Sequence, residues 1–246
     1  MDKSIPKKIH YCWFGGNKLP EEMKRYIAGW RQLCPDYEII EWNEENFDLN
    51  SCEYVKEAYS VKKWAFVSDY ARFKILYEYG GVYFDTDVEL LKNLDNLLRD
   101  GPFLGMEYGS QIAPGLGMAA YPKMKYCEDM LELYDNIHFI NENGTINLKT
   151  ICQYTTEYFM QRGFMDKEII QKIDDIVIYP KEYFNPCDLD TGKIIVSENT
   201  VSIHHYAGTW VDPYSKFRGK VYFLLRKIFG EKGAEAVRRL LGRKEG

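Results

Sequence analysis

The sequence predicts an α/β domain in which a mixed sheet is flanked by helices. Strand and helix patterns alternate through the first half of the chain, as is typical of parallel sheets covered by helices. Short strand patterns cluster in the second half, which favours a mixed sheet. The length of 246 residues is enough for one large domain, or for a domain with an appendage. We expect the domain to span residues 1–213 and an appended tail to span 214–246.

The first strand is expected in residues 5–14 (IPKKIHYCWF), which end in Gly15 and Gly16, where the backbone can approach a ligand. A helix should begin at Pro20, because proline suits a first helical turn and the acids that follow suit the positive end of the helix dipole. Its expected buried face carries Met23, Tyr26, Ile27 and Trp30. A second strand at residues 37–42 and a short helix at 53–59 should follow.

Residues 64–89 (WAFVSDYARFKILYEYGGVYFDTDVE) contain a helix pattern, a turn, a strand pattern and an acidic loop in immediate succession. The helix should stop at the glycine pair 80–81, where a left-handed residue costs little. Residues 82–84 form a β-prone run, and the D-T-D tripeptide 85–87 follows where that strand should end. Open α/β folds bind ligands at strand carboxyl ends, so we expect chemistry here.

The rest of the chain carries shorter patterns. Residues 111–120 (QIAPGLGMAA) are small, glycine-rich and uncharged, which suits a segment against a ligand or a crowded strand; a plain loop is an equal alternative. The other expected elements are a strand end and short helix in 88–100, helices in 124–140 and 147–162, and strands at 103–107, 176–179, 194–196 and 201–204.

Several classes of protein are disfavoured. The six cysteines form no C-x-x-C pair, so neither a zinc site nor a disulfide framework is indicated, and reduced, mostly buried thiols are expected. No signal peptide and no apolar stretch of about 20 residues is present, so we expect a cytosolic protein. Nucleic acid is a poor partner for an acidic body.

The charge is unevenly distributed. Residues 214–246 hold ten Lys or Arg and three Glu, whereas the whole chain has a net charge of −5. Apolar residues recur at helical spacing between these basic residues, which favours a helix lying on the anionic inner face of the cytoplasmic membrane. The alternative is a terminal helix docked on the domain. Liposome flotation with and without this tail distinguishes the two.

A D-x-D tripeptide alone is weak evidence, and a second copy at residues 188–190 serves as a control. That copy follows Asn185-Pro186 and precedes Thr191-Gly192, so it predicts a reverse turn whose acids bond local backbone. Asp85 and Asp87 instead follow a strand at a sheet edge. Two carboxylates in that position suit Mg²⁺ or Mn²⁺ with diphosphate oxygens.

Further candidate residues lie nearby in the predicted fold. Ser68, Asp69 and Arg72 share one helix face and are candidates for holding sugar and ribose hydroxyls, or form an ordinary exposed ion pair. Imidazole is a plausible additional metal ligand, and His204 and His205 end a predicted strand together. Trp13 could stack on a base, although aromatic residues are more often core.

Three blocks, IPKKIHYCWFGG, WAFVSDYARFKILYEYGGVYFDTDVELLKNLD and IHHYAGTW, resemble glycosyltransferase family 32. This family includes enzymes of capsular polysaccharide clusters and initiating mannosyltransferases of yeast, and its core resembles the glucosyltransferase domains of large clostridial toxins. The likeness covers roughly residues 5–210. It implies a GT-A type, Rossmann-like fold.

The resemblance also implies roles for individual residues. Trp13, with Tyr11 on the same strand, would bind the nucleotide; Asp69 and Arg72, beside Ser68, would contact the donor sugar. Asp85 would touch ribose and sugar, Asp87 would bind the metal, and His205 fits the late metal ligand better than His204. Thr209 and Trp210 match a loop that closes over the diphosphate, with threonine where the family often has serine.

The expected function is retaining transfer of a hexose or N-acetylhexosamine from a nucleotide sugar, with a UDP-sugar as the expected donor, to a cell-surface glycan or lipid-linked oligosaccharide. Mn²⁺ or Mg²⁺ is the expected cofactor, and no residue stands out as a nucleophile. A non-catalytic sugar-nucleotide-binding or scaffold protein is one alternative. A metal-dependent nucleotidyltransferase is another, although residues 15–18 (GGNK) are a poor phosphate loop.

Overall fold

The computed structural model describes residues 3–188 and 193–208. Two compact units are present. The larger runs to Pro186 and resumes over Val196–His205, and the smaller takes up the remaining residues. The expected basic tail, as well as Thr209 and Trp210, lies outside the described residues.

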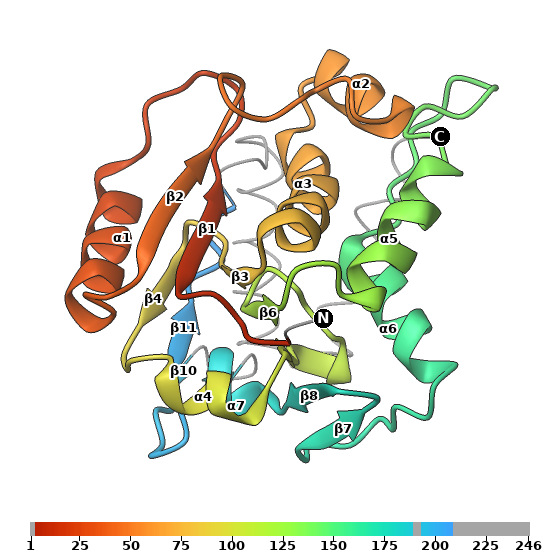
Figure 1. The fold of residues 1–246 in the computed structure, drawn as a ribbon. Helices are drawn as coiled ribbons and strands as arrows, with labels where there is room; N and C mark the ends of the chain where they lie inside the picture. Colours follow the sequence, from red (N-terminus) through yellow and green to blue (C-terminus); the bar gives the residue numbers. More distant parts are fainter. Residues whose placement is uncertain (1–2, 189–192, 209–246) are drawn as a thin grey trace, which may run out of the picture. The chain divides into compact units, whose positions relative to one another are not determined.

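The larger unit is built on a seven-stranded sheet, and its mixed strand directions confirm the predicted mixed sheet. The strand order is β2-β1-β3-β6-β5-β8-β7 (Figure 1). The strands are β1 (Lys8–Cys12), β2 (Glu38–Trp42), β3 (Gly81–Tyr83), β5 (Phe103–Gly105), β6 (Met118–Ala120), β7 (Gln171–Ile173) and β8 (Ile176–Tyr179). Strands β1, β2 and β3 are parallel, and β6 runs antiparallel to both β3 and β5. The carboxyl ends of β1, β3 and β5 therefore lie at the same edge of the sheet.

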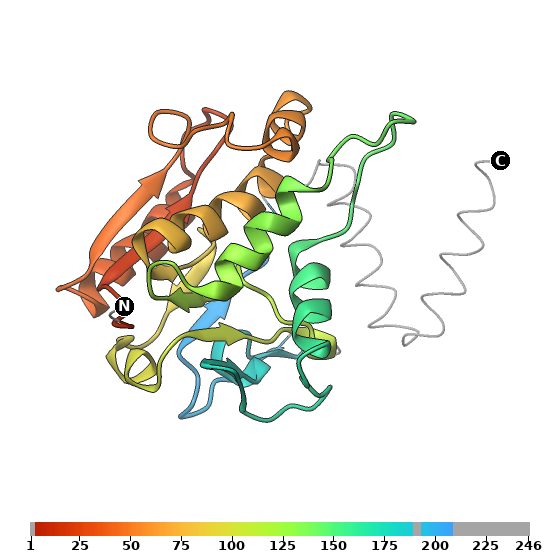
Figure 2. The same cartoon turned by 45° about the vertical axis from the view of Figure 1, so that its right-hand side comes forward.

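Helices cover both faces of this sheet (Figures 1 and 2). One core cluster joins the sheet to α2 (Glu53–Ser60), α3 (Trp64–Tyr79), α5 (Lys125–Asp135) and α6 (Ile151–Met160). The other joins it to α1 (Glu21–Leu33), α4 (Asp95–Asp100) and α7 (Lys181–Phe184). Alternation along one strand separates the two cores: Tyr83 packs in the first, and Val82 and Phe84 pack in the second. A short 3-10 turn, η1 (Tyr108–Ser110), completes the helices of the part of the chain that the structure describes.

A two-stranded antiparallel ribbon pairs β4 (Val88–Leu90) with β11 (Ser202–His204). This ribbon brings the late strand beside the acidic loop that follows β3. In the smaller unit, β9 (Cys187–Asp188) pairs with β10 (Lys193–Ile194). The second D-x-D tripeptide therefore begins in a strand, and its last two residues lie outside the described part of the chain.

Strands β6 and β7 were not predicted from the sequence. Strand β6 is Met-Ala-Ala, which lacks the β-branched residues that mark a strand. It forms because β3 and β5 flank it on both sides. At Gly117, just before β6, an added Cβ would lie 2.9 Å from the ring of Phe84. The crowded-strand interpretation of residues 111–120 is thus correct for their last part.

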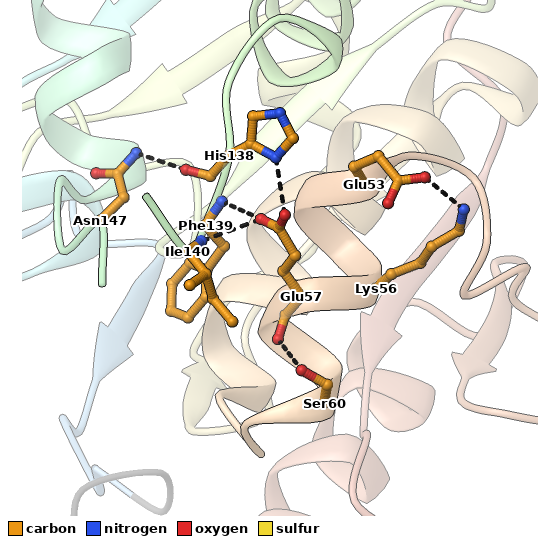
Figure 3. Close-up of polar contacts among 8 residues, drawn as sticks. All are labelled: Glu53, Lys56, Glu57, Ser60, His138, Phe139, Ile140 and Asn147. Carbon is orange, nitrogen blue, oxygen red and sulfur yellow. Dashed lines mark hydrogen bonds and ion pairs between the residues drawn. The ribbon is translucent and has the colours of Figure 1, made fainter. Parts of the chain in front are cut away.

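A carboxylate on α2 holds the segment that follows α5 (Figure 3). Glu57 accepts hydrogen bonds from the backbone N–H groups of Phe139, at 2.7 Å, and Ile140, at 3.0 Å, and Nδ1 of His138 donates to it at 2.8 Å. Burial acts to raise the pKa of Glu57, but these bonds outweigh it and the pKa is lowered. Glu57 therefore anchors the chain that leads into α6.

All six cysteines are free thiols, and Cys12, Cys34 and Cys127 are buried. No helix in the described ranges is both long enough and apolar enough to cross a bilayer.

Candidate active site

Three side chains converge beyond the carboxyl end of β3. Asp85 and Asp87 lie between β3 and β4, and His204 ends β11. One ligand atom from each of these residues lies within 4.8 Å of the other two, and Nε2 of His204 is 3.1 Å from Oδ1 of Asp87. Carboxylate oxygens and an imidazole nitrogen are suitable ligands for Mn²⁺ or Mg²⁺. The donor set therefore fits a divalent cation.

Backbone hydrogen bonds fix the turn that carries the two aspartates. The N–H of Val88 donates to the carbonyl of Asp85 at 3.1 Å, and the N–H of His205 donates to the carbonyl of Asp87 at 3.1 Å. Nε1 of Trp30, on α1, donates to the carbonyl of Val88 at 2.9 Å. Both strands of the ribbon and the buried Trp30 of α1 thus fix the backbone that carries the aspartate side chains.

A buried ion cluster connects α3 to this turn. Nη2 of Arg72 lies 3.0 Å from Oδ1 of Asp69 and 3.3 Å from Oδ1 of Asp85. The guanidinium carbon lies 4.7 Å from the ring centre of Tyr83, whose hydroxyl donates to Asp85 at 3.2 Å. The alternative of an ordinary exposed ion pair is wrong, because only 4% of the Arg72 side chain is accessible.

The charges in this cluster depend on one another. Burial acts to lower the pKa of Arg72, and the carboxylates of Asp85 and Asp69 outweigh it, so the guanidinium remains charged. Burial raises the pKa of Asp69 against the opposing effect of Arg72, and the charge of Asp85 adds to the rise. Arg72 is therefore the charge that allows two carboxylates to remain close together.

The glycine-rich segment lies directly against the site. The N–H of Asp85 donates to the carbonyl of Gly115 at 2.9 Å. A Cβ added at Gly115 would lie 2.1 Å from Oδ2 of Asp85, well inside van der Waals contact. Glycine is therefore required at this position so that the backbone can pack against the carboxylate.

The two adjacent histidines have different environments. His204 is the one beside Asp87, whereas Nε2 of His205 is 2.8 Å from Glu89 and its ring stacks on Tyr26 with centroids 4.7 Å apart. Tyr26 itself is only half-buried, so it does not belong to the buried face of α1. The prediction that placed Tyr26 on that face is wrong. Burial acts to lower the pKa of His204, but the bond to Asp87 and the charges of Asp85 and Glu107 outweigh it and raise it.

Three further predicted nucleotide-binding residues form hydrogen bonds within the protein. Trp13 follows β1, is half-exposed, and donates through Nε1 to the carbonyl of Asn17 at 2.6 Å. The hydroxyl of Tyr11 donates to Glu41 at 2.7 Å, and that of Ser68 donates to the carbonyl of Trp64 at 3.1 Å, within its own helix. The structure therefore gives Tyr11 and Ser68 partners within the protein.

Glu107 is a site residue that was not singled out from the sequence. It follows β5, at the same sheet edge as Asp85, and is partly buried. Burial raises the pKa of the Cys152 thiol, near the start of α6, and the charges of Glu107 and Asp69 add to the rise. An acid at the end of the strand predicted for residues 103–107 was the available signal.

Comparison with known proteins agrees with this geometry. The family described as a glycosyltransferase sugar-binding region containing a DXD motif matches residues 20–104. An uncharacterized glycosyltransferase of Acanthamoeba polyphaga mimivirus is 31% identical over 203 residues, which are 77% of this chain and 76% of that protein.

Fungal relatives match over shorter stretches. Inositol phosphoceramide mannosyltransferase 3 of Schizosaccharomyces pombe is 33% identical over 104 residues, covering 39% of this chain and 28% of its own length. A mannosyl phosphorylinositol ceramide synthase of Saccharomyces cerevisiae is 35% identical over 168 residues, covering 63% of this chain and 41% of its own length. The chain thus spans less than half of either fungal protein.

Among solved structures, the PaToxG glycosyltransferase superposes with a TM-score of 0.50 at 17% identity, covering 65% of this chain and 69% of its own. This similarity supports a shared fold.

Proposed function

The chain belongs to the glycosyltransferases whose sugar-binding region contains a DXD motif, and we propose that it is a metal-assisted, retaining enzyme that uses a nucleotide sugar. It would transfer a hexose or N-acetylhexosamine to a glycan or lipid-linked acceptor, with a UDP-sugar as the first candidate donor. The observation that carries this proposal is the convergence of Asp85, Asp87 and His204.

The same three residues would hold the divalent ion. When bound there, Mn²⁺ or Mg²⁺ would supply positive charge to stabilise the departing nucleoside diphosphate. We assign the histidine ligand to His204, because His205 already bonds Glu89 and stacks on Tyr26. Asp87 orients His204 through their 3.1 Å contact, and the ribbon fixes the backbone of both residues.

Asp69 and Arg72 would orient the donor sugar. Arg72 is anchored by Asp69, by Asp85 and by the carbonyl of Ser68, to which its Nε donates at 3.1 Å. This anchoring holds the Asp85 carboxylate in one position before any donor binds. A preorganised charge cluster of this kind needs little rearrangement when the leaving group develops its charge.

We propose that the acceptor attacks the sugar on the same face as the departing diphosphate, which retains the configuration at the anomeric carbon. Detection of a covalent glycosyl-enzyme adduct by intact-mass spectrometry would contradict this step. The fungal relatives are named for mannosyl transfer to inositol phosphoceramide. A hydroxyl on a lipid-borne headgroup is therefore an acceptor class to test beside polysaccharides.

Donor hydrolysis tests the proposed function without knowledge of the acceptor. A panel of UDP- and GDP-sugars is incubated with Mn²⁺, and release of the nucleoside diphosphate is measured. We expect turnover of at least one donor, and a loss of roughly 10³-fold in Asp87→Asn, because charge stabilisation of the leaving group is removed. Asp166→Asn, at an exposed position after α6, is the matched control. Turnover that is unaffected by both chelator and Asp87→Asn would refute the proposal.

A further inference from the structure

Trp13 leaves the sheet beside the turn that carries the two aspartates. Strands β1 and β3 are parallel neighbours. Trp13 and Asp85 therefore follow adjacent strands at the same edge of the sheet. The indole of Trp13 is partly exposed, and its Nε1 donates to the carbonyl of Asn17 at 2.6 Å. An aromatic ring one strand away from the proposed diphosphate site is suited to stack on the base of a nucleotide.

The backbone on both sides of this indole is fixed. The N–H of Trp13 donates to the carbonyl of Trp42, the last residue of β2, at 2.8 Å. The next side chain, Phe14, is buried and packs edge-on against Phe47, with ring centroids 5.7 Å apart. The position of Trp13 is thus tied to the segment that follows β2.

Glu44, in that segment, holds the turn that follows Trp13. Its Oε1 accepts a hydrogen bond from the N–H of Gly15 at 2.6 Å and one from the hydroxyl of Tyr59, on α2, at 3.2 Å. The ring of Tyr59 packs on that of Trp64 with centroids 4.7 Å apart. A Cβ added to Gly15 would lie 2.6 Å from Nε1 of Trp64. The turn is therefore held by one carboxylate and packed against one indole.

The segment that carries Glu44 is closed by its own hydrogen bonds. The N–H of Asn43 donates to Oδ1 of Asn46 at 2.9 Å, and the N–H of Phe47 donates to the carbonyl of Asn43 at 3.0 Å. Nδ2 of Asn46 also donates to the carbonyl of Glu41, within β2, at 2.8 Å. The backbone of Glu44 is thus fixed to the sheet, and its carboxylate transmits that position to Gly15.

We propose that Glu44 is a positioning residue for the nucleoside part of the donor: by holding the N–H of Gly15, it keeps the indole of Trp13 in the orientation that stacks on the base. This inference rests on the proposed function. A hydrogen bond to a carboxylate is roughly twice as strong as one between neutral groups, so it is well suited to hold a short turn. An aromatic ring that is already in place loses little conformational freedom when the base binds.

The test measures the binding of UDP, GDP and inorganic pyrophosphate, each with Mn²⁺, by calorimetric titration. Glu44→Ala should weaken binding of the nucleoside diphosphate that wild type prefers by roughly 5- to 30-fold, the lower half of the range for stacking a base on an aromatic ring. Pyrophosphate has no base, so its affinity should be unchanged, which also verifies folding. Glu45→Ala, at the next and exposed position, is the matched control and should behave as wild type.

A double-mutant cycle with Trp13→Ala separates positioning from a general structural role. Because Glu44 acts through Trp13, Glu44→Ala should cause no further loss of nucleoside diphosphate affinity in the Trp13→Ala protein. Glu44→Gln keeps an acceptor for Gly15 and Tyr59, so it should recover most of the binding that Glu44→Ala loses.

An equal loss for pyrophosphate, no loss for either nucleoside diphosphate, or the same loss in the Trp13→Ala protein would overturn the inference. So would a Glu44→Gln protein that binds no better than Glu44→Ala. Failure of wild type to bind either nucleoside diphosphate would instead refute the proposed function itself.

Discussion

The segment 80–87 is held by neutral hydrogen bonds at its first residue, the entry, and by charged groups at its last residues, the exit. At the entry, His10 is completely buried; its Nε2 donates to the carbonyl of Gly80 at 2.9 Å, and its Nδ1 accepts from Nε1 of Trp42 at 3.1 Å. Both partners are neutral. At the exit, Asp85 and Asp87 lie among charged groups.

The histidines at these two ends show what the difference means. Burial lowers the pKa of His10 to about 4, because neither partner compensates a charged imidazole. His204 is partly buried, and burial acts to lower its pKa, yet the pKa is raised because Asp87 lies beside it. At Gly80, the contacts of His10 are therefore structural and require a neutral imidazole. At Asp85 and Asp87, the negative charge is concentrated and can bind a cation.

The largest effect is expected when the positive charge of Arg72 is removed from the cluster around Asp85. Arg72→Met leaves Asp69 and Asp85 close together without their shared partner. We expect a loss of about 3–5 kcal/mol in the free energy of unfolding, as for a buried ion pair that loses one member. Urea unfolding followed by circular dichroism measures it, with Arg25→Met on the exposed face of α1 as the control. A loss below about 1 kcal/mol would show that the cluster is solvated.

The entry end should respond to pH. The folded-state pKa of His10 is below its ordinary value of 6.5, so the unfolded chain binds the extra proton first. The stability that neutral His10 contributes is present above pH 6.5 and is lost as the pH falls toward about 4. We expect a decrease of about 2 kcal/mol between pH 7 and pH 5 from this group.

His10→Gln keeps one donor and one acceptor and should lack this share of the pH dependence. The difference between the two proteins cancels other titrating groups, including Asp69, whose raised pKa acts in the opposite direction. Parallel pH profiles of wild type and His10→Gln would show that folding does not lower the pKa of His10.

The smallest expected effect separates the two adjacent histidines. His205→Phe keeps a ring to stack on Tyr26 and loses the bond to Glu89, so we expect a change of about 1 kcal/mol in stability and nearly unchanged Mn²⁺ affinity. His204→Phe should weaken Mn²⁺ binding strongly, as measured by calorimetric titration. The reverse pattern would make His205 the ligand.

Local patterns predicted much of the fold, because α1 and α3 carry clear helical periodicity and the glycine stop before β3 is unambiguous. Asp85 and Asp87 could be distinguished from the second D-x-D tripeptide, residues 188–190, because a predicted strand precedes them. The family resemblance favoured His205 over His204 as the metal ligand, whereas His204 is the one beside Asp87; local patterns alone could not make this distinction. It depends on the register of β11 against β4, and consecutive residues of a strand point to opposite sides.

Other features were hidden for different reasons. Strand β6 has little strand propensity of its own and depends on its two neighbours. Arg72 carries ordinary helical spacing, so its burial follows only from the packing of α3 on the sheet. Glu107 could have been found as an acid at the end of the strand predicted for residues 103–107.

The ribbon between β4 and β11 also bears on how the protein is made. Asp87 and His204 are 117 residues apart in sequence, yet every strand of the seven-stranded sheet precedes β11. A growing chain can therefore complete its sheet on the ribosome before the last proposed metal ligand has emerged. We expect an unfinished chain to fold without consuming nucleotide sugar, so activity begins only after synthesis has passed β11.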